Sequence, residues 1–241
     1  PDAPAPALRN VNLTIKLNTL VAFAGSSGAG KSTLADILLG FLTPSSGTLV
    51  TGSTVIDSSN VRAWQRHLGY VPQNIFLVDD SIAANVAFGT AENEPDKPSV
   101  EKALRLANLD ALVADLPEGI NFGVGERGMR LSGGQRQRVG IARALYHDAE
   151  VLVMDEATSA LDNLTEQEIV RTITHLKGRK TIIMIAHRLS TIKSADQIVF
   201  MEKGSISAIG TFDELCASSA GFRQMALSSV VEAKNDADAP T

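Results

Sequence analysis

The feature that most constrains the fold is a glycine-rich stretch from Gly25 to Thr33, with the sequence GSSGAGKST. It follows the apolar run Leu20 to Ala24, a pattern typical of a buried strand, and precedes the helical pattern Leu34 to Leu39. A strand, a glycine-rich turn ending in Lys-Ser and a helix are the context of a phosphate-binding loop. A surface loop would explain the glycines but not Lys31 and Ser32 at this offset. The stretch therefore predicts a nucleoside triphosphate site.

Each residue type in this loop has an expected chemical role. Glycines let the backbone wrap so that successive N–H groups point at phosphate oxygens, and the N-terminus of the following helix adds a favourable dipole. Lys31 is expected to reach the β- and γ-phosphates, and Ser32 to bind Mg²⁺. The residues expected to bind ATP are Gly25, Ser26, Ser27, Gly28, Ala29, Gly30, Lys31, Ser32 and Thr33.

A second apolar run, Val151 to Glu156, ends in two acidic residues (VLVMDE). Ligands of open α/β sheets bind at the C-terminal ends of the strands, where these acids are expected to lie. A nucleoside triphosphatase needs a carboxylate near its metal and a base that orients the attacking water. We assign Asp155 to Mg²⁺ and Glu156 to the base. The alternative, an acidic turn after a core strand, is weaker because the chain also carries a phosphate-binding loop.

Between these two elements lies the sequence LSGGQ, Leu131 to Gln135, followed by the helical pattern Arg136 to Leu145. A Ser-Gly-Gly turn that opens a helix exposes N–H groups and a hydroxyl, which suit a second γ-phosphate. In a two-fold dimer, each ATP would lie between the loop of one copy and this turn of the other. The residues expected to contact the partner's ATP are Ser132, Gly133, Gly134 and Gln135. Among the arginines that follow, at least Arg138 is expected on a solvated helix face with acidic neighbours.

Short β-type runs alternate with helical patterns, which predicts an α/β domain with a largely parallel sheet. Strands are expected at Leu20 to Ala24, Gly69 to Val71, Val151 to Met154 and Thr181 to Ala186. Antiparallel strands are expected within Thr48 to Ile56, and at Gln197 to Met201 with Ser205 to Ile209, which would turn at Lys203-Gly204. Between them, a helical subdomain is expected at about 90–146, where Ser99 would cap a helix carrying Val100, Leu104, Ala107 and Ala111 on one face.

Composition excludes several other classes of protein. With 44% hydrophobic and 20% charged residues, the chain is neither disordered nor collagen-like. A formal net charge of −5 provides no positive field for nucleic acid. The apolar runs fall short of the roughly 20 residues that cross a bilayer. Cys216 is the single cysteine, so it is expected to be a packing residue, and no Cys or His cluster has metal-ligand spacing.

Over nearly its whole length the chain resembles the nucleotide-binding domain of an ATP-binding cassette (ABC) transporter, with the phosphate-binding loop, LSGGQ and VLVMDE in the family's order. The resemblance implies an α/β fold: a P-loop NTPase core with a mostly parallel central sheet, an antiparallel β subdomain and an inserted helical subdomain. It further implies an ABC domain at 1–229 and a transmembrane domain outside this chain. The loss of periodicity and the gain of Asp, Asn and Pro after that domain predict a disordered tail at 230–241.

Other residues receive roles through the same resemblance. Gln73, in YVPQ, resembles the glutamine that touches Mg²⁺ and the attacking water. Asp162, in SALD, resembles the loop that crosses the dimer interface, and His187 resembles the histidine that contacts the γ-phosphate. The implied catalytic residues are Glu156, His187, Gln73 and Lys31, and the implied Mg²⁺ ligands are Ser32, Gln73 and Asp155.

The segment Val124 to Gly128 (VGERG) resembles the element by which exporter-type cassettes contact the coupling helices of the membrane domain. The implied function is the ATP-hydrolysing motor of an exporter or of a lipid or oligosaccharide flippase, with ATP and Mg²⁺ as cofactors. Its partners would be a second such domain, most simply an identical one, and the transmembrane domain of the same full-length protein, with no nucleic acid. The fragment itself would be soluble, and the whole protein would work at the cytoplasmic face of the inner membrane.

Two departures from the family's pattern and two alternatives accompany this interpretation. Asp80 replaces a glycine usual before the Ser/Thr, and the aromatic residue that stacks on adenine is expected upstream of Pro1.

A non-transport cassette ATPase acting on nucleic acid or the ribosome commonly carries coiled coils or tandem cassettes, and neither pattern occurs here. A non-catalytic regulatory subunit conflicts with intact Lys31, Glu156 and His187.

Overall fold

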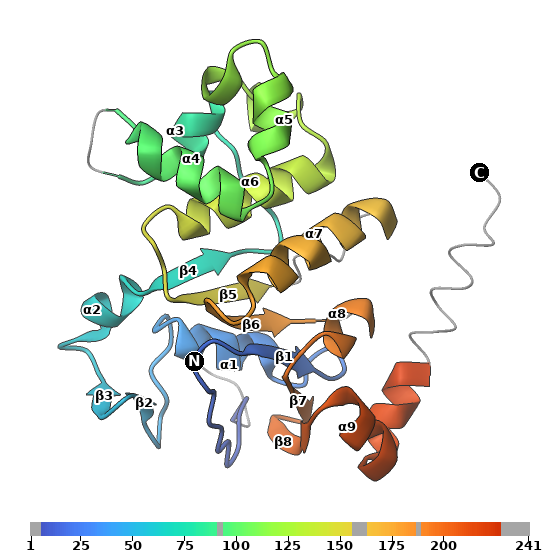
Figure 1. Cartoon of the computed structure of the whole chain (residues 1–241). Coiled ribbons are helices and arrows are strands. Elements are labelled where there is room, and N and C mark those ends of the chain that lie inside the picture. The colour runs from blue at the N-terminus through green and yellow to red at the C-terminus, as the bar shows by residue number, and fades with distance from the viewer. Residues whose placement is uncertain (1–5, 91–93, 156–162, 187–188, 228–241) are drawn as a thin grey trace.

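A computed structural model describes residues 6–90, 94–155, 163–186 and 189–227 of the chain. Within this part, a six-stranded sheet has the order β4-β5-β6-β1-β7-β8, and β2 and β3 form a separate antiparallel pair (Figure 1). The bounds of the sheet strands, in sheet order, are Leu68–Val71, Val151–Asp155, Thr181–Ile185, Leu20–Ala24, Gln197–Glu202 and Ser205–Gly210. The first five strands are mutually parallel and β8 is antiparallel to β7. The predicted fold class is therefore confirmed.

The central strands β5, β6, β1 and β7 are buried over most of their length, which explains their near-continuous apolar sequences. Every residue of β1 and of β6 is buried. Successive side chains of a strand point to opposite faces. Leu20, Ala22 and Ala24 accordingly join one hydrophobic cluster, while Val21 and Phe23 join the other. The expected positions of the four parallel strands are correct to within one residue at each end.

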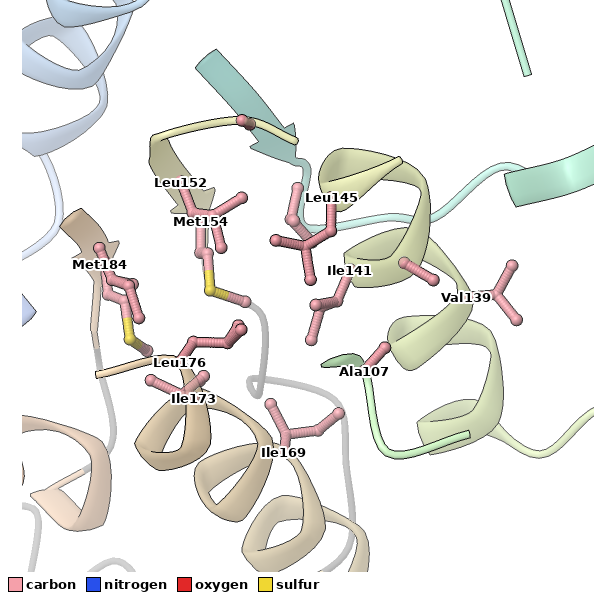
Figure 2. Close-up of a cluster of buried hydrophobic side chains, with 14 of the residues drawn as sticks. Ala107, Val139, Ile141, Leu145, Leu152, Met154, Ile169, Ile173, Leu176 and Met184 are labelled. Carbon is pink, nitrogen blue, oxygen red and sulfur yellow. The ribbon is translucent and has the colours of Figure 1, made fainter. Parts of the chain in front are cut away.

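Helices cover the two faces of the sheet unequally. On one face, α1 (Lys31–Leu38) packs its Leu34 and Ala35 against the sheet. On the other face lie α6 (Gly133–Leu145) and α7 (Asn163–Leu176), whose apolar residues meet those of β5 and β6. Figure 2 shows this second cluster, in which Met154 and Met184 of the sheet lie beside Ile141, Ile173 and Leu176 of the two helices.

The remaining elements are short. They are β2 (Leu49–Thr51), β3 (Thr54–Ile56), α2 (Val61–Gln65), α3 (Ile82–Val86), α4 (Lys97–Leu106), α5 (Asp110–Asp115), α8 (Leu189–Lys193), α9 (Phe212–Ser218) and the 3-10 turns η1 (Gly119–Asn121) and η2 (Glu126–Gly128). The β7–β8 hairpin turns at Lys203-Gly204 as expected, and both residues have positive φ, the conformation that matches strand twist. Cys216 packs against the core, also as expected.

The expected cap of the helix after Pro98 is wrong. The helix α4 begins at Lys97, and Asp96 is its N-cap, with its carboxylate accepting a hydrogen bond from the Ser99 N–H at 3.0 Å. Proline is tolerated inside the first turn because its missing N–H would have no partner there. Ala111 lies in α5 instead of α4, because the chain turns at Asn108, which has a φ of 54°.

Candidate functional site

The C-terminal ends of neighbouring parallel strands bring the predicted site residues to one edge of the sheet. Gln73 lies two residues beyond β4, and Asp155 ends the adjacent strand β5. The glycine-rich loop follows β1, which is separated from β5 by β6 alone. Glu156, Asp162 and His187, three of the residues assigned from sequence, lie outside the described residues.

Two positions of the loop strongly favour glycine. Gly25 has a φ of 144°, and a Cβ there would lie 2.2 Å from the carbonyl oxygen of Met201 in β7. Gly30, the N-cap of α1, has a φ of 99°, and its Cβ would lie 2.7 Å from a methyl group of Leu8. A side chain at either position would clash as well as strain the backbone. The loop is therefore wrapped as tightly as the phosphate-binding interpretation requires.

Lys31 places a positive charge inside this loop. Its side chain is 5% exposed, and its ammonium group donates hydrogen bonds to the carbonyl oxygens of Gly25, at 2.8 Å, and of Ser26, at 2.9 Å. The first turn of α1 contains no acidic residue, so nothing there offsets the partial positive charge of the helix N-terminus. The loop thus fits a polyanion such as a triphosphate.

Oxygen-bearing side chains occur at the same sheet edge, after the strands and in the loop, and Mg²⁺ prefers hard oxygen ligands. Asp155 is half-buried, and strand alternation puts it on the face of the sheet that α1 covers. Its carboxylate also acts on Tyr70 of β4, whose pKa is raised first by burial and then by the charges of Asp155 and Asp36. Ser32 and Gln73, the other expected ligands, are exposed.

Within the described ranges, no group of three or more His, Cys, Asp or Glu side chains is arranged to hold a metal ion. Mg²⁺ in nucleotide sites is commonly held by one or two protein carboxylates together with substrate phosphates and water. A strand-end acid, Asp155, without a group of three metal-ligating side chains around it fits that mode better than an all-protein cage.

The Ser-Gly-Gly turn begins α6 through a reciprocal cap. The Ser132 hydroxyl accepts from the Gln135 N–H at 3.2 Å, and the Gln135 carboxamide oxygen accepts from the Ser132 N–H at 2.8 Å. Ser132 is nevertheless exposed. Because α6 and α1 cover opposite faces of the sheet, the turn and the phosphate-binding loop of one chain begin helices on different sides of it.

The expectation of a solvated Arg138 is wrong. Its side chain is 13% exposed, forms an ion pair with Glu168 of α7 at 2.9 Å and donates to the Asn108 carbonyl oxygen at 2.9 Å. The physical reason is Gly134, one turn earlier in α6, whose missing side chain lets α7 approach. Sequence reasoning missed this because a charged helix face gives no sign of what packs against it.

The segment after Gln73 is held by residues to which the sequence assigned no role. Buried Asn85 of α3 bonds to both the N–H and the carbonyl of Val78, each at 3.0 Å. Arg143 of α6 donates to the carbonyl oxygens of Phe76, at 2.9 Å, and Asn85, at 2.8 Å. Burial lowers the pKa of Arg143.

The exporter-like element packs on the same segment. Gly128 has a φ of 72°, and a Cβ there would lie 2.6 Å from a methyl group of Leu77. Glu126, at the start of this turn, is exposed. The element and the stretch after Gln73 therefore form one continuous region, which contacts α6 through Arg143.

A family model described as ABC transporter matches residues 8–159. The chain is 42% identical over 218 residues to an ATP-dependent lipid A-core flippase of Cupriavidus pinatubonensis (strain JMP 134 / LMG 1197), covering 90% of this chain and 37% of the relative. It is 46% identical over 209 residues to a protein of the same name from Burkholderia pseudomallei (strain 1710b), covering 86% and 34%. The solved structure of a bacterial Atm1-family ABC exporter with ATP bound superposes with a TM-score of 0.83 at 36% identity, covering 94% of this chain and 39% of that one. The chain thus spans little more than a third of the length of the curated relatives.

Proposed function

The chain belongs to the ABC transporter family, as its nucleotide-binding domain, and we propose that it is the ATP-hydrolysing motor of an exporter or lipid flippase. The observation that carries this proposal is the buried Lys31 ammonium inside a loop with glycine at its two tightest positions, Gly25 and Gly30, at the sheet edge where Asp155 ends β5. Within the described residues no helix is both long and apolar enough to span a membrane.

In the proposed reaction, the amides of the Gly25–Thr33 loop and the Lys31 ammonium hold the phosphates of ATP. Ser32, Asp155 and Gln73 would hold Mg²⁺, which neutralises phosphate charge when bound. Glu156 orients the attacking water and accepts its proton. The oxygen of this water bonds to the γ-phosphorus while the bond between that phosphorus and its bridging oxygen breaks, which yields ADP and inorganic phosphate. His187, directly after the strand beside β5, donates a hydrogen bond to the γ-phosphate.

We further propose that two copies close on each ATP. The opposite placement of α1 and α6 about the sheet supports a trans role for Ser132, Gly133, Gly134 and Gln135, with Asp162 at the interface. An ATP on the loop of one chain would meet this turn from the partner, so that hydrolysis would reopen the dimer.

The transmembrane partner is inferred from the greater length of the flippases and the exporter that the chain resembles. The continuous region formed by Gly128 and the stretch after Gln73 would contact it, at the cytoplasmic face of the inner membrane. The names of the relatives favour lipid as the cargo. Within this chain, the ABC domain would be 1–229, with the helical subdomain at about 90–146 and a tail at 230–241.

Substitution of the proposed base tests this function. Glu156→Gln is expected to abolish ATP turnover while leaving ATP binding intact, because the amide cannot accept the proton of water. A dimer should then accumulate with Mg²⁺ and ATP, visible by size-exclusion chromatography. Glu150→Gln is the matched control, since Glu150 is exposed and precedes β5. Near-normal hydrolysis by Glu156→Gln would remove Glu156 from the mechanism.

A further inference from the structure

The chain after Gln73 is held to α6 at two neighbouring residues. Ile75 packs against α6 at Gly140, where a Cβ would clash with the Cδ1 atom of Ile75. One turn further along α6, Arg143 donates to the Phe76 carbonyl oxygen at 2.9 Å. One contact fixes a side chain and the other fixes the backbone, so the first half of this segment cannot slide along the helix.

The second half of the segment is held by the turn η2 and by α3. Leu77 is buried beside Gly128, where a Cβ would lie 2.6 Å from a methyl group of Leu77. The fully buried Asn85 donates to the Val78 carbonyl oxygen and accepts from the Val78 N–H, each at 3.0 Å. It also donates to the Ser81 carbonyl oxygen at 3.0 Å. The carboxamide of Asn85 therefore serves to fix the backbone that leads into α3.

A single arginine joins the two halves, and the helices that carry them pack against each other (Figure 1). Besides the Phe76 carbonyl, the Arg143 guanidinium bonds the Asn85 carbonyl oxygen at 2.8 Å and the Asn85 side-chain oxygen at 3.3 Å. Arginine presents its donors in a rigid planar fork, whereas lysine carries a compact ammonium group on a flexible stem. We call Arg143 and Asn85 the α6–α3 brace.

Gln73 consequently lies in a short span between two fixed ends. On one side β4, which is paired with β5, ends at Val71. On the other side Ile75 is the first residue that α6 holds. Three residues, 72–74, lie between these ends, and the ring of Pro72 fixes its own φ. So short a span has little freedom to absorb a displacement, and a shift of the braced segment must therefore reach Gln73.

We propose that the α6–α3 brace positions Gln73 for Mg²⁺, with Arg143 and Asn85 as positioning residues outside the site, an inference that rests on the proposed function. Gln73 is exposed, and the backbone that carries it sets its place at the sheet edge beside Asp155. Loss of a partner that orients a metal ligand costs about 10–100-fold in metal affinity. The brace acts through the backbone and not on the ligand directly, so we expect a loss of about tenfold, the lower end of this range.

The experiment measures ATP affinity by titration calorimetry, once with Mg²⁺ and once with EDTA, for the wild type and Arg143→Lys. Lysine keeps the charge but cannot reproduce the fork, so the fold should persist while the brace loosens. The ratio of the two affinities should fall about tenfold, whereas the affinity in EDTA should not change, because the Lys31 loop is untouched. Arg105→Lys, at an exposed position on α4, is the matched control and should keep the wild-type ratio.

Removing Gln73 separates positioning from stability. In a Gln73→Ala background, Arg143→Lys should leave the affinity ratio unchanged, because the ligand that the brace positions is already absent. The effect of Arg143→Lys on the melting temperature should persist in that background, since the bonds to Phe76 and Asn85 do not involve Gln73.

A second variant moves the segment without changing a charge. Gly140→Ala places a methyl group against Ile75 and should lower the affinity ratio as Arg143→Lys does. Adding Ile75→Ala removes the atoms in the way and should restore the ratio. This pair keeps the proposal testable even where Arg143→Lys reduces the yield of folded protein.

Four results would overturn the proposal, and they can be told apart. A wild-type affinity ratio in Arg143→Lys, with only a lower melting temperature, would make the brace a purely structural feature. An equal further loss in the Gln73→Ala background would show that Arg143 does not act through Gln73. A wild type that hydrolyses ATP but binds it equally well with and without Mg²⁺ would remove the inference and leave the proposed function standing. A wild type that neither binds nor hydrolyses ATP would instead refute the proposed function, and the inference would fall with it.

Discussion

The ammonium group of Lys31, the first residue of α1, lies 2.8 Å from the carbonyl oxygen of Gly25, the first residue of the glycine-rich loop. A second bond to the Ser26 carbonyl, at 2.9 Å, holds the charge within the loop. The lysine is therefore positioned by the backbone that it is expected to help in binding phosphate.

Lys31→Ala should weaken ATP binding about tenfold or more, because a hydrogen bond to a charged group contributes about 1.5–3 kcal/mol. Titration calorimetry with ATP and Mg²⁺ measures the loss. Lys16→Ala, at an exposed position before β1, is the control and should bind as the wild type does. Equal affinity of the two variants would contradict the assigned role of Lys31.

Gly134→Ala should destabilise the fold by about 1 kcal/mol, because overpacking against Thr165 costs about 1–3 kcal/mol and outweighs the gain in helix propensity of up to about 1 kcal/mol. Thr165→Ser removes the methyl group in the way. In that background the same Gly134→Ala change should be neutral or stabilising. Urea denaturation of the four proteins checks the change of sign, and a penalty that persists beside Ser would argue against the close contact.

Arg143→Met should lower the free energy of unfolding by about 2 kcal/mol, since it strands the Phe76 and Asn85 carbonyl oxygens that the half-buried guanidinium now satisfies. Arg105→Met, at an exposed position on α4, is the control and should change stability by less than about 0.5 kcal/mol. The measurement is the urea midpoint at constant slope. Similar midpoints for both variants would mean that Arg143 does not brace the segment after Gln73.

Stability should depend on pH through Asp148, whose pKa lies below its usual value of 3.8 because of its hydrogen bonds first to Lys180 and then to Lys102. A lowered pKa in the folded state stabilises the protein above the unfolded-state pKa, and this contribution is lost as the pH falls through the folded-state pKa. Asp148→Asn should therefore cost about 0.5 kcal/mol near neutral pH, the scale of an exposed ion pair. Asparagine also tolerates the φ of 57° at this position.

The pH profile of the difference between wild type and Asp148→Asn checks this prediction. The difference should be constant from neutral pH down to about pH 5, shrink as the pH falls further and vanish once the folded-state carboxyl is protonated. Asp79→Asn, at an exposed position, serves as the control for removing one charge. A difference that grows as the pH falls would refute the stabilising role of Asp148.

The strands β1, β5 and β6 could be predicted from sequence because they are buried on both faces, so their apolar runs are visible without knowledge of their neighbours. The start of α4 was predicted less well. Asp96 and Ser99 are both good caps, and the choice between them depends on the path of the chain before Pro98.

The sequence by itself determined the phosphate-binding loop, because its glycines with positive φ and the Lys-Ser pair after them are neighbours in the chain. No contact with a distant segment is needed to recognise them. It also determined the order along the chain of β4, which precedes Gln73, and β5, which ends at Asp155. It did not determine that these two strands are neighbours in the sheet. Only the tertiary structure decided that Arg138 pairs with Glu168 of α7 and is not solvated. The physical reason is that an arginine is compatible with a helix whether it faces solvent or another helix. Its environment is therefore decided by the packing of α7 against α6.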